Sequence, residues 1–457
     1  MKSRMFNIIC LLCTMVNSVL MCACSDNQVE TTIPEISISV GDEEISSLCF
    51  EGYASSNMVA IRSTGDFELS VDADWCQLSN SGGSATLTDY QTVWLKISVG
   101  KNESDYSRTA ILTAQTGSVT KRITINQKGT AEKDEYGFEV AKVALHSMGN
   151  GLNIGNTLDS YGDWITGGEP KDYETAWGNP QISPALISTY KQAGFKALRL
   201  PVTWRGHIDE EGNITDGAWL KRVREVVDYI INQDMYCIIN VHHDSGGDNG
   251  AWLRADQDDE RLTVISKKFV NLWTSIANEF ASYGDKLIFE GYNEMLDGNL
   301  TWSNTDEKGY ASLNQLAQDF VSAVRSTGGA NAHRNLIVNT YGADCGNMSV
   351  SNFRLPKDTV SNHLMVEVHI YSDTTAQLDA YFEALENHFT SKGIPVIIGE
   401  FGKNGETPED EQVEYVEYFL SKASRLHVPA FHWFDIIDRN SLEWTLPKVK
   451  ETILKYN

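Results

Sequence analysis

The strongest constraint on the fold is a repeated alternation between short apolar runs and longer amphipathic segments over roughly the last 320 residues. In one such unit, Leu220, Val223, Val227 and Ile231 share a helix face, and the buried-strand pattern of residues 236–241 follows. Such alternation indicates a parallel sheet with helical connections. Eight strands are predicted, at residues 152–158, 195–202, 235–243, 286–294, 335–341, 363–371, 394–401 and 428–435. Eight units predict a closed α/β TIM (β/α)8 barrel, with a doubly wound sheet as the alternative.

Polar and aromatic side chains follow these apolar runs, where each predicted strand ends. A barrel gathers the carboxyl ends of its strands around one mouth, where enzymes of this fold keep their active sites. A doubly wound sheet would spread the same residues along a longer edge. The residues are Asn153, Asn156, Arg199, His242, His243, Asn293, Glu294, Asn339, Tyr341, His369, Tyr371, Glu400 and Trp433. Their pattern favours the barrel and predicts a polar site at its mouth.

Two of these residues, Glu294 and Glu400, are carboxylates that would face each other from the fourth and seventh strands. Hydrolysis of a glycosidic bond needs such a pair. One group protonates the leaving oxygen, and the other attacks the anomeric carbon or activates a water. A purely structural alternative is a salt-bridged arrangement with Arg199. The grouping with histidines and aromatic residues favours catalysis.

Glu290 and Glu367 have the same strand parity as Glu294 and His369, so they are expected to point inward. We interpret them as buried partners of Arg199 or of the histidines, and they are the alternative candidates for the catalytic carboxylates.

A metal centre is not expected. Adjacent residues on a strand point to opposite faces, so His242 and His243 would not easily bind one ion. The chain has no HExxH motif, and no cofactor is predicted.

The barrel region resembles the family 5 glycoside hydrolases of clan A, in the branch of endoglucanases and xyloglucanases. The resemblance covers roughly residues 137–457 and lies in the segments 151–159, 174–180, 194–204, 240–244, 292–294, 369–371 and 399–402. An Asn-Glu pair alone is weak, but the ordered set is specific. Met295 departs from the Pro that many relatives have after the acid/base Glu.

The resemblance implies a retaining endo-β-1,4-glucanase in which Glu294 is the acid/base and Glu400 the nucleophile. It further implies that Arg199 and Tyr371 support Glu400 and that His369 contacts Glu294 or the sugar. The remaining substrate-binding residues are expected to be Asn156, His242, His243, Asn293 and Trp433, with Asn293 on the 2-hydroxyl and Trp433 stacked on the sugar. Loop residues such as Trp164, Trp252 and Trp302 are expected to set the preference among glycans.

The segment from residue 35 to 128 has period-two alternation without a helical period, which predicts an all-β immunoglobulin-like sandwich. It resembles a BACON-type module in residues 74–76, 107–113 and 123–128. Such a module is either a rigid spacer or a carbohydrate-binding domain, and the spacer is favoured. Residues 129–136 are a predicted linker, and residues 137–457 are the predicted hydrolase domain.

The first 24 residues are predicted to be a lipoprotein signal, because Lys2 and Arg4 precede an apolar run that ends near Cys24. Ala23 before Cys24 resembles a bacterial lipobox, which implies lipidation of Cys24 and a tether at residues 25–34. We therefore expect a cell-surface or outer-membrane lipoprotein of a Gram-negative bacterium, with free secretion as the alternative.

The excess of acidic over basic residues indicates which kinds of partner the protein can bind. The formal net charge is −25, which argues against nucleic acid because phosphate neutralisation needs Lys and Arg. The expected partner is a neutral β-linked plant polysaccharide, bound by a monomer. A β-mannanase with the same mechanism and a non-catalytic surface glycan-binding protein are the alternatives.

Overall fold

The computed structural model describes residues 34–457, apart from 85–90, 103–106, 130–132, 135, 248–249, 303 and 404–405. The predicted signal, Cys24 and nearly all of the predicted tether lie outside the described residues. No helix in the described ranges combines the length and apolar character that a bilayer span requires.

The N-terminal domain is a sandwich of two five-stranded sheets, as the alternating pattern predicted. One sheet has the order β2-β1-β4-β8-β6, with β1 Ile36–Val40, β2 Glu43–Glu44, β4 Ser55–Ser63, β6 Cys76–Leu78 and β8 Gln91–Val99. The other has the order β3-β10-β9-β5-β7, with β3 Ser47–Phe50, β5 Phe67–Val71, β7 Gly82–Gly83, β9 Arg108–Thr116 and β10 Val119–Gln127. Inward-facing apolar residues such as Ile38, Ile61, Leu95 and Leu112 form the core between the sheets.

The C-terminal domain is a closed barrel of eight parallel strands, which confirms the predicted architecture. The strands are β11 Gly151–Asn153, β12 Ala197–Leu200, β13 Tyr236–Asn240, β14 Leu287–Glu290, β15 Leu336–Asn339, β16 Leu364–Ile370, β17 Val396–Phe401 and β18 Ala430–His432. The connecting α-helices are α2 Pro170–Glu174, α3 Pro184–Ala193, α4 Gly217–Ile231, α5 Asp259–Glu279, α6 Glu307–Ser326, α7 Asn347–Asn352, α8 Thr375–His388, α9 Glu409–Arg425 and α10 Pro447–Lys455. Amphipathic faces of these helices pack against the outside of the barrel in one large apolar cluster.

Most of the predicted strands were too long at their carboxyl ends, whereas the seventh ends at Phe401 as predicted. The first was predicted at residues 152–158 but ends at Asn153, and the fourth was predicted to reach Glu294 but ends at Glu290. The reason is that the chain stays buried after leaving the sheet. Ile154 and Leu158 are fully buried in a loop, so their apolar character extends the strand pattern.

Helix α1, Ala141–Met148, closes the end of the barrel where the strands begin. Its buried residues pack with inward-facing Ile238, Ile288, Ile337 and Ile397 in a separate apolar cluster. The next inward layer toward the other end is polar, and it includes Arg199 and Glu290. Because one end is plugged by apolar side chains, the polar layer can open only at the carboxyl ends of the strands.

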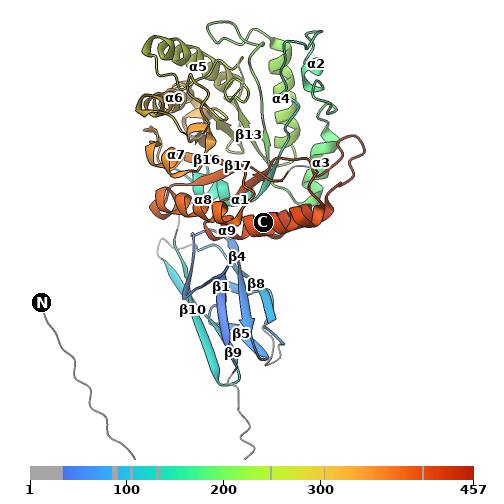
Figure 1. Cartoon of the computed structure of the whole chain (residues 1–457), viewed down its shortest axis with the longest axis vertical. Coiled ribbons are helices and arrows are strands. Elements are labelled where there is room, and N and C mark those ends of the chain that lie inside the picture. Colours follow the sequence, from blue (N-terminus) through green and yellow to red (C-terminus); the bar gives the residue numbers. More distant parts are fainter. Residues whose placement is uncertain are drawn as a thin grey trace, which may run out of the picture.

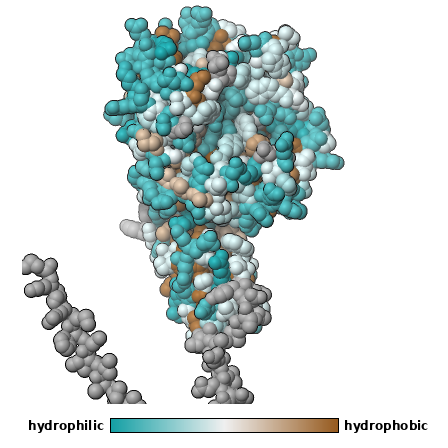
Figure 2. Space-filling view, in the orientation of Figure 1, coloured by the Kyte–Doolittle hydropathy of each residue, from teal (hydrophilic) through white to brown (hydrophobic). Residues whose placement is uncertain are grey.

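The sandwich is docked against the plugged end of the barrel and forms a separate lobe beside α1 and α9 (Figure 1). His427 Nε2 lies 2.9 Å from the carbonyl oxygen of Cys49, and the rings of Tyr53 and His146 stack at 4.2 Å. These barrel residues precede β18 and β11, so the interface lies opposite the mouth. The face shown in Figure 2 is mostly hydrophilic over the barrel, in keeping with the acidic composition.

Candidate active site

Arg199 is the centre of the polar layer inside the barrel. Its side chain projects from β12 and is fully buried, and it forms two hydrogen bonds of 2.7 and 2.8 Å with the carboxylate of Glu290. Its Nε lies 3.4 Å from Glu367, and its Nη1 donates to Oε1 of Glu400 at 2.8 Å. Burial by itself lowers the pKa of the guanidinium, but these carboxylates raise it well above the ordinary value. Arg199 is therefore a fixed buried cation, and the predicted inward partners Glu290 and Glu367 are confirmed.

Glu400 lies near the end of β17, where the register between β16 and β17 shifts. Oε1 of Glu400 accepts the hydrogen bond from Arg199, and Oε2 accepts one of 2.9 Å from the hydroxyl of Tyr371. The predicted contact with Tyr371 is thereby confirmed. These two donors, one of them cationic, fix the orientation of the carboxylate.

Glu294 lies in the loop after β14, and its surroundings differ from those of Glu400. Its Oε1 is 2.8 Å from Nδ1 of His369, which confirms the expected contact. Its side chain is 23% exposed, against 7% for Glu400. Carboxylate oxygens of the two glutamates and a ring nitrogen of His369 all lie within 4.8 Å of one another. The two predicted carboxylates therefore meet in one site.

His369 connects this pair to the buried layer. Its Nδ1 faces Glu294 and lies 3.6 Å from Glu400, and its Nε2 lies 3.2 Å from Glu367. Burial lowers the pKa of His369, but the three carboxylates outweigh burial and raise the pKa to about 10. The imidazole is therefore a cation at neutral pH, and it balances part of the negative charge in the site.

Glu367 occupies its position only because residue 399 is a glycine. A Cβ at Gly399 would lie 1.9 Å from the Glu367 carboxylate oxygen that faces His369 and Arg199. Burial, together with the charge of Glu290, raises the pKa of Glu367. A small residue at 399 thus lets a full carboxylate pack beneath Glu400.

Asn293 and Glu294 form one side of a cavity of about 500 Å³ at the mouth. Oδ1 of Asn293 accepts a hydrogen bond of 2.8 Å from Arg199, which directs its amide nitrogen elsewhere. The remaining lining residues are Tyr161, His243, Gly246, Gly247 and Trp302. Trp302 is 49% exposed and packs over Gly247, where a Cβ would lie 2.8 Å from the indole. The cavity therefore combines hydrogen-bonding groups with an open aromatic face.

His242 and His243 both lie beyond the end of β13, so the argument that they point to opposite faces of a strand was wrong. Their ring nitrogens and a carboxylate oxygen of Asp159 lie within 4.8 Å of one another. His242 is buried, contacts Asn240 through Nδ1 at 3.0 Å, and stacks at 5.7 Å on Trp433. Burial, with nearby positive charge, holds the pKa of His242 well below its ordinary value.

Trp433 and Asn156 follow the last and first strands. The half-buried indole of Trp433 packs on Gly155, where a Cβ would lie 2.8 Å from the ring. Asn156 is exposed, has a φ of 57°, and its backbone N–H donates to Asp159 at 3.0 Å. Trp433 therefore presents a flat ring beside His242, whereas Asn156 lies in the outer loop.

Three further residues belong to the site and were not predicted: Tyr161, Trp177 and Asn240. The ring of Tyr161 lies 5.1 Å from His243, and Trp177 lies 5.4 Å from the same histidine. Asn240 donates to Glu290 at 3.0 Å. Because Asn240 is a polar residue at the end of an apolar strand, the sequence pattern could have identified it as a site residue. Trp252, expected to set glycan preference, instead donates to Asp244 at 2.7 Å and does not line this cavity.

Comparisons with known proteins agree with this geometry. A model of the family "Cellulase (glycosyl hydrolase family 5)" matches residues 158–441, and the BACON model of N-terminal binding domains matches residues 65–128. Endoglucanase A of Clostridium longisporum is 32% identical over 69% of this chain, which spans 65% of that relative's length. The crystal structure of a glycoside hydrolase family 5 enzyme from Prevotella bryantii is 42% identical, with a TM-score of 0.66, over 70% of this chain and 99% of that one.

A further solved structure extends over both domains. The xyloglucanase of Bacteroides ovatus, solved with a heptasaccharide, is 25% identical with a TM-score of 0.62, and the match covers 92% of this chain and 99% of that one. The first family model covers more than half of the chain, in the region that holds the paired carboxylates. The chain therefore belongs to glycosyl hydrolase family 5.

Proposed function

We propose that the chain is a retaining endo-β-1,4-glucanase that hydrolyses plant β-glucans of the cellulose, mixed-linkage or xyloglucan type. The observation that carries this proposal is the approach of Glu294 and Glu400 to within 4.8 Å. Retaining enzymes place their carboxyl groups about 5–5.5 Å apart, whereas inverting enzymes need about 6.5–9.5 Å to admit a water between them. The short separation supports double displacement. The endoglucanases and the xyloglucanase among the relatives support a β-glucan as substrate.

Glu400 is the nucleophile in this proposal. Arg199 and Tyr371 hold its two oxygens, so the carboxylate is oriented before the sugar arrives. It attacks the anomeric carbon and forms a covalent glycosyl-enzyme. The glycosidic oxygen leaves with a proton from another group.

Glu294 supplies that proton. It is the more exposed carboxylate and lines the cavity at the mouth, where the leaving part of the chain can lie. After the first step Glu294 takes a proton from water, and the water attacks the anomeric carbon to release the sugar. His369 positions the carboxylate through the contact at Nδ1.

The surrounding residues hold the attacked sugar. Asn293 directs its amide nitrogen to the 2-hydroxyl, because Arg199 already occupies its oxygen. Trp433 stacks on the sugar ring, and His242 keeps the indole in place by stacking on it. His243 contacts hydroxyl groups from the wall of the cavity, and Asn156 reaches the sugar chain from the outer loop.

A reducing-end assay on carboxymethyl cellulose, barley β-glucan, xyloglucan, mannan and xylan tests the proposal. We expect activity on one or more of the glucans, and loss of at least about a thousandfold in kcat for Glu294→Ala and for Glu400→Ala. The exposed Glu210→Ala is the matched control and keeps wild-type activity. Higher activity on mannan than on the glucans would show that the protein is a β-mannanase with the same mechanism. Near-normal turnover by either catalytic variant would overturn the assignment.

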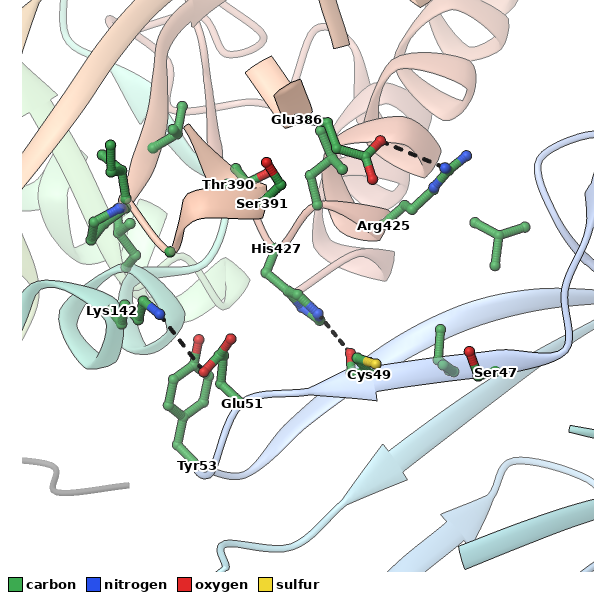
Figure 3. Close-up of a pocket in the computed structure, with 18 of the residues that line it drawn as sticks. Ser47, Cys49, Glu51, Tyr53, Lys142, Glu386, Thr390, Ser391, Arg425 and His427 are labelled. Atoms are coloured by element: carbon green, nitrogen blue, oxygen red, sulfur yellow. Dashed lines mark hydrogen bonds and ion pairs between the residues drawn. The ribbon is translucent and has the colours of Figure 1, made fainter. Parts of the chain in front are cut away.

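The sandwich serves as a spacer in our proposal. It is docked on the plugged end of the barrel, and the cavity between the two domains is lined by residues of both (Figure 3). Arg425 pairs with Glu43 at 2.8 Å and Lys142 lies 3.9 Å from Glu51 across this interface. Such docking fixes the direction of the mouth, away from the sandwich. Affinity electrophoresis in a gel that contains polysaccharide tests this role, with the isolated sandwich and the full-length Glu400→Ala variant. Retardation of the isolated sandwich would show that it has its own sugar site and would contradict the role of a spacer.

We further propose that Cys24 carries a lipid anchor that attaches the protein to the outer membrane. The support is the sequence pattern around Ala23 and Cys24. Cys24→Ala is expected to move the protein from the membrane fraction to the soluble fraction, and an unlipidated N-terminus downstream of Cys24 in the wild type would contradict the anchor.

A further inference from the structure

His369 lies between carboxylates on both sides of its ring. Nδ1 is 2.8 Å from Oε1 of Glu294 and 3.6 Å from Oε2 of Glu400, whereas Nε2 is 3.2 Å from Oε1 of Glu367. An ionised carboxylate only accepts hydrogen bonds, so each contact requires a proton on the ring nitrogen. Only the imidazolium ion has a proton on both nitrogens. These contacts therefore fix His369 as a cation, with Glu367 as the partner of Nε2.

The other titratable groups near the ring do not supply the negative charge at Nε2. Arg199, from β12, is a cation that lies 3.4 Å from the same oxygen of Glu367. His242, beyond the end of β13, is neutral because burial lowers its pKa well below the ordinary value. Tyr371 keeps its proton because burial raises its pKa. The charge at Nε2 therefore comes from Glu367, to which the catalytic steps proposed above give no role.

Arg199 does not by itself explain why residue 367 carries a charge. The guanidinium already forms two hydrogen bonds with Glu290 and one with Glu400. The side chain of Glu367 is fully buried, and burial together with the charge of Glu290 raises its pKa to about 7. A glutamine would fill the same space without the cost of a buried charge. The carboxylate therefore points to a role at its other contact, His369.

The number of protons on His369 decides which oxygen of Glu294 can carry the proton for the leaving group. With a hydrogen on Nδ1, the ring donates to Oε1, so a protonated Glu294 holds its own hydrogen on Oε2. With a neutral ring whose single hydrogen faces Glu367, Nδ1 is an acceptor and takes a hydrogen bond from a protonated Oε1. That proton then lies between Glu294 and His369, away from the glycosidic oxygen.

We propose that Glu367 is a positioning residue that keeps His369 doubly protonated and thereby places the catalytic proton of Glu294 on Oε2. In the first step this proton passes from Oε2 to the glycosidic oxygen, while the bond from C1 to that oxygen breaks and C1 bonds to Glu400. The electron pair of the broken bond stays on the oxygen, which the proton neutralises. This inference rests on the proposed glucanase function and assigns a task to a residue buried beneath the site.

NMR of the full-length protein with isotope-labelled histidine measures the protons on the ring nitrogens directly, and His369→Gln identifies the signals of this ring. Burial lowers the pKa of His369, but the three carboxylates raise it to about 10, so we expect a proton on both nitrogens of the wild type at pH 8. In Glu367→Gln, which removes one charge and keeps the shape, we expect this pKa to fall to about 7–8. A wild-type ring with one proton at pH 8 would overturn the role of Glu367.

The rate on two leaving groups tests the place of the proton. The alcohol released from barley β-glucan must be protonated, whereas the dinitrophenolate of a dinitrophenyl β-cellotrioside leaves without a proton. At pH 9 we expect Glu367→Gln to lower kcat/KM on the glucan at least about tenfold and to leave kcat/KM on the aryl glycoside within about twofold. At pH 5 the variant keeps both ring protons, so the difference between the two substrates is expected to disappear.

Glu290→Gln is the matched control, because Glu290 is an equally buried carboxylate of the same layer that binds Arg199 and Asn240. Since Arg199 also holds the nucleophile Glu400, this variant is expected to slow both substrates by a similar factor at pH 9 and at pH 5. A separation of the two substrates in Glu367→Gln but not in Glu290→Gln identifies the path through His369.

The outcomes separate the two proposals. A wild-type protein that releases no reducing ends from barley β-glucan overturns the glucanase function. An active wild type whose Glu367→Gln variant slows both substrates equally at pH 9, or slows neither, overturns the role of Glu367 alone. Melting curves of both variants show whether a lost activity comes from lost fold, and the NMR measurement on the wild type needs no variant with altered activity.

Discussion

Carboxylate oxygens of Glu294 and Glu400 lie within 4.8 Å of each other, although one residue lies in the loop after β14 and the other near the end of β17. Their environments differ in a way that suits two roles. Glu400 is buried between Arg199 and Tyr371, whereas Glu294 contacts His369 and faces the cavity. The pair thus combines one carboxylate held between two donors with one that lines the open cavity.

Tyr371→Phe removes the hydroxyl that binds Oε2 of Glu400 but keeps the ring. Hydrogen bonds to charged groups contribute about 1.5–3 kcal/mol, so we expect kcat to fall about 10- to 150-fold. Steady-state kinetics on the preferred glucan check this value. Tyr456→Phe is the control, because Tyr456 also donates to a glutamate, Glu417, at 3.0 Å, and contacts the sandwich side of the barrel. Equal effects of the two variants would contradict a specific role for Tyr371.

Arg199→Met tests the buried cation. Removal of one partner from a buried ionic network costs about 3–5 kcal/mol, because Glu290, Glu367 and Glu400 would lose their common counter-charge. Urea unfolding measures the change. Arg62→Met serves as control, since Arg62 and Asp42 form an exposed pair at 3.5 Å whose loss is expected to cost less than about 1 kcal/mol. A small effect at Arg199 would mean that the carboxylates share protons in its place.

Gly399→Ala tests the close approach of Glu367 to the backbone of β17. The added methyl group would lie 1.9 Å from the carboxylate oxygen, so we expect a loss of about 1–3 kcal/mol or more in the free energy of unfolding, and lower kcat. Gly217→Ala, at the start of α4, has no heavy atom within 4 Å of its new Cβ and should be nearly neutral. Thermal melting and steady-state kinetics of both variants measure these changes. A Gly399→Ala variant with the melting temperature and kcat of the wild type would refute the steric argument.

The pH dependence of stability is expected to include a contribution from His432 of β18. Burial lowers its pKa from 6.5 to about 4, so the folded state holds this imidazole neutral. The unfolded state takes up the proton first as the pH falls. The contribution of His432 to the free energy of unfolding is therefore fully present above pH 6.5 and is lost as the pH drops toward 4, which costs about 3 kcal/mol. Urea unfolding at pH 4 and pH 7 should show this slope in the wild type and a smaller one in His432→Phe. Equal changes in the free energy of unfolding between pH 7 and pH 4 in the two proteins would contradict a contribution from His432.

The number and order of the barrel strands could be predicted because each strand is an apolar run between amphipathic helices. Their ends could not, because loop residues such as Ile154 remain as buried as the strand before them. This error placed His242 and His243 on a strand and led to an incorrect statement about their directions. The positions of Glu294 and Glu400 were still found, since a closed barrel gathers strand ends and the loops that follow them at one mouth.

Contacts between residues far apart in the chain were harder to predict from the sequence. Parity indicated that Glu290 and Glu367 point inward, but nothing in the sequence showed that Gly399 makes room for Glu367. The docking of His427 on Cys49 depends on how the two domains pack against each other. Such features follow from three-dimensional complementarity and have no periodic signature.

The stereochemistry of the first product tests the paired carboxylates most directly. Proton NMR can follow the anomeric signals while the wild-type protein cleaves a short β-glucan oligosaccharide, before mutarotation mixes the anomers. We predict that the β-anomer appears first, because double displacement through Glu400 retains configuration. Initial appearance of the α-anomer would show a single displacement by water and would contradict the role of Glu400 as nucleophile.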